Sequence, residues 1–166
     1  MRGQYFSFDA VIATVIMVLA FSSLIAYWTG TQKVVEERTS GRLADAGRIA
    51  EMLLTPGLPA NWQAGGISAI RQIGIAKTFG NELDMGKMLR LRALANSRYA
   101  NVGNLLRAGG DYYILIESTD GTSWYEIGRP YYPSNATDIA VANRGVTYIG
   151  EDGNSHAARL RVFLYR

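Results

Sequence analysis

The chain has 166 residues, of which 48% are hydrophobic and 19% are charged, and its net charge is +3. The apolar content argues against intrinsic disorder, and the lack of cysteine excludes a disulfide scaffold, thiolate zinc sites and a cysteine nucleophile. A surplus of three positive charges does not indicate a nucleic-acid binder. Since only one long uncharged run is present, a polytopic membrane protein is also excluded.

The uncharged run covers the 23 residues from Ala10 to Gln32, and its apolar side chains fall on every face of a helix. At about 1.5 Å per residue, roughly 20 residues cross the hydrocarbon core, so we predict a membrane-spanning helix over about 10–32. Tyr27 and Trp28 are suited to an interfacial anchor. A cleaved secretory signal is the alternative, but its apolar region is shorter and ends in small residues.

The residues ahead of this run are Met1-Arg2-Gly3-Gln4 and then Tyr5-Phe6-Ser7-Phe8-Asp9. This stretch resembles the class III signal peptide of archaeal type IV pilins and archaellins. The resemblance implies that residues 1–3 are removed by cleavage between Gly3 and Gln4, and that the apolar helix stays attached. In the commonest archaeal form a serine and a glutamate occupy mature positions three and five, whereas here Ser7 is fourth and Asp9 is sixth.

Asp9 places a carboxylate at the edge of the predicted span, where a charge is costly and calls for a partner. The resemblance implies that this partner is the freed amino group of a neighbouring subunit, so that Asp9 registers the helices in a filament. The alternative is a hydrated carboxylate that complements the positive N-terminal end of the helix.

Apolar residues at three- and four-residue spacing continue to Leu54, and Pro56 ends the pattern. We therefore predict one long helix over 4–54, a turn-rich linker over 55–68 and an extracytoplasmic domain over 69–166. The short N-terminus is expected inside the cell, because long domains translocate largely regardless of their charge. This layout resembles the type IV pilin fold.

Within the domain, the pattern predicts a strand over 69–76, a helix from Asp84 as N-cap to about Ala95, and a helix over 97–108 closed by Gly109 and Gly110. Further strands are expected over 112–117, 123–127, 139–149 and 160–164. The predicted fold class is α+β, with helices packed on a mainly antiparallel sheet.

Motifs that carry chemistry are few. His156 is predicted to be a solvated loop residue, and Glu151, Asp152 and Asn154 fit a hairpin tip better than a calcium loop. Neither a Walker loop nor a Gly-x-Ser-x-Gly motif occurs. We therefore predict a protein that is not an enzyme and that holds no cofactor or metal.

Five basic residues and no acidic one lie between Met85 and Gly110. On one helical phase Lys87, Arg90 and Arg98 share a side, which would form an electropositive surface for anionic glycans, DNA or a neighbouring subunit. The alternative is a pair of solvated helices. Asn135 begins an Asn-Ala-Thr sequon and is a candidate N-glycosylation acceptor.

The resemblance implies a structural subunit of an archaeal type IV pilus-like filament, minor or specialised, that polymerises through its N-terminal helix and uses its outer domain for adhesion or surface contact. Its partners would be other pilin subunits, the class III prepilin peptidase, the pilus assembly platform, the membrane, and an extracellular glycan or surface ligand. It would lie in the cytoplasmic membrane before assembly and in a cell-surface filament afterwards. The alternative is a single-pass, membrane-anchored monomeric ectodomain that binds a ligand without polymerising.

Overall fold

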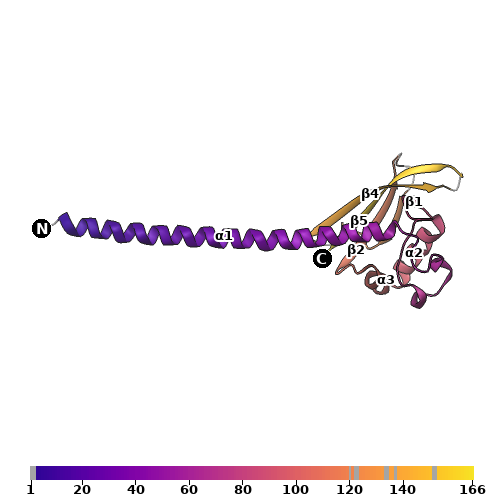
Figure 1. Ribbon diagram of the computed structural model, residues 1–166, viewed down its shortest axis with the longest axis horizontal. Coiled ribbons are helices and arrows are strands. Elements are labelled where there is room, and N and C mark those ends of the chain that lie inside the picture. Colours follow the sequence, from indigo (N-terminus) through magenta and orange to yellow (C-terminus); the bar gives the residue numbers. More distant parts are fainter. Residues whose placement is uncertain (1–2, 120, 122–123, 133–134, 137, 151–152) are drawn as a thin grey trace. The chain divides into compact units, whose positions relative to one another are not determined.

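The computed structural model describes residues 3–119, 121, 124–132, 135–136, 138–150 and 153–166 (Figure 1). The chain forms two compact units, Met1–Ser40 and Gly41–Arg166. Helix α1 (Gly3–Leu53) provides the whole helical part of the first unit and the first element of the second. It matches the long helix predicted over 4–54 to within one residue at each end.

The second unit is an α+β domain, as the sequence predicts. After α1 come two short 3-10 helices, Trp62–Ala64 and Ile67–Ala69, and the helices α2 (Met85–Ser97) and α3 (Tyr99–Leu106). The strands are β1 (Glu82–Leu83), β2 (Asp111–Ser118), β3 (Trp124–Gly128), β4 (Ile139–Ile149) and β5 (Ser155–Tyr165). They form one sheet in the order β1-β4-β5-β2-β3, in which β1 is parallel to β4 and the other pairs are antiparallel.

The main core lies between one face of the sheet and the helices, and Figure 1 shows α2 and α3 on the same side of the sheet as the end of α1. The last turns of α1 contribute side chains at i, i+3, i+4 and i+7 spacing, the pattern of a helix face that packs on a core. These fully buried residues are Ala46, Ile49, Ala50 and Leu53. The end of α1 is therefore part of the domain.

Two ion pairs fix the direction of this part of α1. Arg42 pairs with Asp138 at 2.6 Å, just before β4, and Glu51 pairs with Arg144 at 2.7 Å, in the middle of β4. Residue numbers rise together along both elements, so the end of α1 and β4 run in the same direction.

The strand expected over 69–76 is not formed, and this prediction is wrong. The backbone of this segment makes two isolated bridges, Gln72 with Leu58 and Ala76 with Leu83 of β1, and the Ile75 N–H donates to the Leu53 carbonyl at 2.8 Å. The segment thus bonds to the end of α1 and to the chain that follows it, and it meets the sheet through the bridge of Ala76 to β1 without forming a strand. All three of its isoleucines are nevertheless buried, as the apolar pattern predicts.

Residues 55–68, expected as a linker, are packed against the domain. Trp62 is only 1% exposed, and its Nε1 donates to the Gly74 carbonyl at 2.7 Å. A Cβ at Gly74 would clash with the Thr55 carbonyl oxygen, so only glycine allows this close approach of two backbone segments.

Helix ends and strand ends differ slightly from the prediction. Asp84 is the N-cap of α2, as expected, and its Oδ1 accepts a hydrogen bond from the Lys87 N–H at 3.0 Å. Helix α3 is closed by Arg107 in the left-handed conformation (φ 53°) and not by the glycines that follow. Strand β5 begins at Ser155, five residues before the predicted start at 160.

Candidate functional surfaces

The segment Phe8–Gln32 of α1 is long and apolar enough to cross a membrane. Its side chains are exposed around the whole helix, so this segment needs cover from lipid or from other protein. The hydroxyl groups of its serines and threonines are satisfied within the helix, because each donates to a carbonyl three or four residues earlier at 2.8–3.2 Å, as hydrocarbon surroundings demand. These residues are Thr14, Ser22, Ser23, Thr29 and Thr31.

Asp9 lies one residue inside the start of this span, and its side chain is exposed. Within residues 8–32, it is the one charged side chain. Gly3 and Gln4, the predicted processing junction, lie in the first turn of α1, whereas Met1 and Arg2 lie outside the described residues.

Lys87 does not belong to the predicted electropositive surface. Its side chain is 3% exposed, and Nζ donates to the carbonyls of Pro56 and Ala76, both at 2.9 Å. The lysine side chain points inward from α2 because the Pro56 and Ala76 carbonyls lie within hydrogen-bond distance of Nζ and act as its acceptors. Lys87 therefore ties residues 55–76 to α2.

Arg90 and Arg98, by contrast, are exposed and line the same groove, which has a volume of about 360 Å³. Arg90 donates to the Gly65 carbonyl at 3.4 Å, a long contact that engages one of its five N–H donors. Arg98 lies at the junction of α2 and α3. The remaining lining residues are Gly66, Ile67, Ser68, Leu94 and Ser97.

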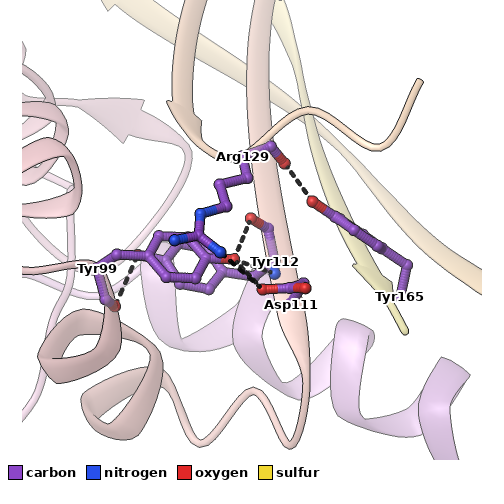
Figure 2. A network of polar contacts seen from close by, with 5 residues as sticks. All are labelled: Tyr99, Asp111, Tyr112, Arg129 and Tyr165. Atoms are coloured by element: carbon purple, nitrogen blue, oxygen red, sulfur yellow. Dashed lines mark hydrogen bonds and ion pairs between the residues drawn. The ribbon is translucent and has the colours of Figure 1, made fainter. Parts of the chain in front are cut away.

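A network of polar and aromatic contacts, missed by the sequence prediction, joins α3 to the sheet (Figure 2). The Tyr99 hydroxyl donates to Asp111 Oδ1 and accepts from the Tyr112 N–H, both at 2.9 Å. The rings of Tyr99 and Tyr112 stack with centroids 4.6 Å apart, and the Arg129 guanidinium lies 4.4 Å from the Tyr99 centroid. The Tyr165 hydroxyl donates to the Arg129 carbonyl at 2.7 Å.

This network is a structural brace. It ties the first turn of α3 to the start of β2, the end of β5 and the residue after β3. Burial raises the pKa of both Tyr99 and Tyr112, so both phenols are neutral near pH 7. In the sequence, Asp111 and Tyr112 lie at the start of the predicted strand over 112–117, but only the fold brings Tyr99 and Arg129 to them.

The other residues singled out in the sequence are Asn135, His156, Glu151 and Asp152, and those that the structure describes do not come together in one site. Asn135 is exposed, as a glycan acceptor must be, while Thr137 of its sequon lies outside the described residues. His156 is not a solvated loop residue: it is half-buried in β5 and stacks on Tyr148 with centroids 5.4 Å apart. Glu151 and Asp152 lie outside the described residues, and the part of the chain that is described contains no cluster of three or more metal-ligating side chains.

No family model, curated protein or solved structure matches this chain.

Proposed function

We propose that this protein is a structural subunit of an archaeal type IV pilus-like cell-surface filament, minor or specialised, that polymerises through α1 and presents its domain for adhesion or surface contact. The observation that carries the proposal is the composition of α1 along its length. Residues 8–32 are exposed, and Asp9 is their only charge, whereas residues 46–53 of the same helix supply part of a domain core.

An exposed apolar helix of this length is covered by lipid when the subunit lies in the membrane. The same surface is covered equally well by the helices of other subunits. Because the serine and threonine hydroxyl groups of residues 8–32 already bond to carbonyls of the same helix, they lose no hydrogen bond in that exchange. Asp9 adds a charge that a cation of a neighbouring subunit would neutralise, and a freed amino group at Gln4 would be that cation.

The proposal includes the partners of such a subunit. Class III prepilin peptidase would cleave between Gly3 and Gln4, an assembly platform would extract the helix from the cytoplasmic membrane, and other pilin subunits would receive it. The domain would face outwards, without catalytic activity, and contact an extracellular glycan or another surface ligand.

Sequencing the N-terminus of the mature protein tests the proposal most directly. We expect the mature chain to begin at Gln4. Retention of Met1 would contradict the proposal, and so would a start near Thr29, which would indicate a cleaved secretory signal.

Filament formation then separates a pilin-like subunit from a monomeric, membrane-anchored ectodomain. We expect Gly3→Leu to abolish both processing and filaments, as seen by electron microscopy of the cell surface. Gly30→Ala is the matched control, because a Cβ at Gly30 meets no atom within 4 Å in this structure. Normal processing without any filament would favour the monomeric ectodomain.

A further inference from the structure

We propose that the groove lined by Arg90 and Arg98 binds a carboxylated sugar, such as a hexuronic acid unit of a surface polysaccharide. The inference rests on the proposed function in one respect, that the domain faces outwards and contacts surface ligands. It names the site and the class of ligand for that contact.

The two arginines have binding capacity that the fold does not use. Elsewhere in the domain, arginines on α1 and on the strands pair with carboxylates, as in the contacts of Arg42 with Asp138 and of Arg144 with Glu51. Among the residues that the structure describes, neither Arg90 nor Arg98 forms an ion pair. A planar guanidinium fork matches a carboxylate in a bidentate geometry, so this pair favours an oxyanion.

The rest of the groove suits a sugar ring. Its volume of about 360 Å³ falls within the range of roughly 300–1,000 Å³ typical of small-molecule sites. Ile67 and Leu94 provide an apolar wall for the C–H face of a ring. Ser68 and Ser97 add hydroxyl groups, and since the Ser97 hydroxyl donates to the Ala93 carbonyl at 2.8 Å, its lone pairs can accept from a sugar hydroxyl.

Nucleic acid fits this surface less well. Affinity for a phosphate backbone comes from a row of cations, about 6–10 contacts in a typical complex. Here the burial of Lys87 removes one of the three predicted cations, and Arg92 does not line the groove. Two arginines around a hollow favour one carboxylate on a compact ligand over a polymer of phosphates.

The test is a calorimetric titration, in which trigalacturonate is added to the full chain in detergent micelles. We expect binding to the unmodified protein, a loss of about tenfold in affinity for Arg90→Gln and for Arg98→Gln, and a larger loss for the double variant. Arg92→Gln is the matched control, because Arg92 is an exposed arginine on the same helix outside the groove. Its affinity should equal that of the unmodified protein.

Four outcomes would overturn the inference. They are no binding of trigalacturonate, equal weakening by Arg92→Gln, equal binding of neutral trigalactose, and tighter binding of an oligothymidylate or of inorganic phosphate. Circular dichroism of each variant identifies an effect of misfolding. The titration uses dispersed subunits, so its result does not depend on filament assembly. If trigalacturonate does not bind but processing and filaments are normal, this inference alone is refuted. If trigalacturonate binds but no filaments form, the proposed function alone is refuted.

Discussion

Replacing Lys87 by methionine removes a buried ammonium group while keeping its apolar stem. In the structure Nζ donates to the Pro56 and Ala76 carbonyls at 2.9 Å, and the side chain is 3% exposed. Loss of the donor leaves both carbonyls without a hydrogen bond, which lowers the free energy of unfolding by about 1–3 kcal/mol for each carbonyl. The buried apolar surface of the methionine side chain stabilises the folded state and offsets part of this loss. We expect the free energy of unfolding to fall by about 2–4 kcal/mol.

The control is Lys77→Met. Lys77 pairs with Glu82 at 3.1 Å, but both side chains are about half exposed (58% and 44%), and such surface pairs contribute less than about 1 kcal/mol. Urea unfolding of both variants and the unmodified chain, in the same detergent, gives the comparison, provided that the dependence on urea concentration is unchanged.

A loss below about 0.5 kcal/mol for Lys87→Met, within the range of ordinary surface substitutions, would refute the assignment of Lys87 as an internal tie. A loss equal to that of Lys77→Met would refute it as well. Under folding conditions the variant should still bind trigalacturonate, because Lys87 does not line the groove.

Three further predictions concern the domain. Gly74→Ala should cost at least about 3 kcal/mol in urea unfolding, because its Cβ would clash with a backbone carbonyl, whereas Gly145→Ala, with nothing within 4 Å, should change stability by less than about 1 kcal/mol. Asp84→Ala removes the N-cap of α2 and should cost about 1 kcal/mol in the same assay. Burial raises the pKa of Tyr99, so the folded state favours the neutral phenol; this stability is complete below about pH 10, the pKa of an unfolded tyrosine, and is lost as the pH rises further. The decline in alkaline unfolding experiments should be shallower for Tyr99→Phe, and an identical decline would contradict the role of its phenol.

The sequence predicted regular elements well where the pattern was long. The eleven residues of β4 match the predicted range of 139–149, and the cap at Asp84 was recognised because capping depends on residues three apart. Short apolar runs do not distinguish a strand from an irregular buried segment, and for this reason the pattern of residues 69–76 predicts a strand although their backbone bonds to the end of α1 and to Thr55.

The candidate groove was only partly predictable. Helical spacing placed Arg90 near Arg98, but the same reasoning included Lys87, because a sequence does not show the carbonyls of Pro56 and Ala76 that draw it inward. Residues 66–68, which form one wall of the groove, fall in the stretch for which the sequence predicts a linker. Its position depends on the packing of Trp62, a tertiary contact that no local pattern encodes.

The arrangement of α1 beside β4 has a mechanical consequence. A pull on residues 42–53 along their own helical direction acts along β4 and loads the ion pairs of Arg42 with Asp138 and of Glu51 with Arg144 in shear. The buried side chains from Ala46 to Leu53 lie along the same direction, so they must slide past the sheet together instead of separating one after another. The last turns of α1 therefore resist such a pull through several contacts that are loaded at the same time.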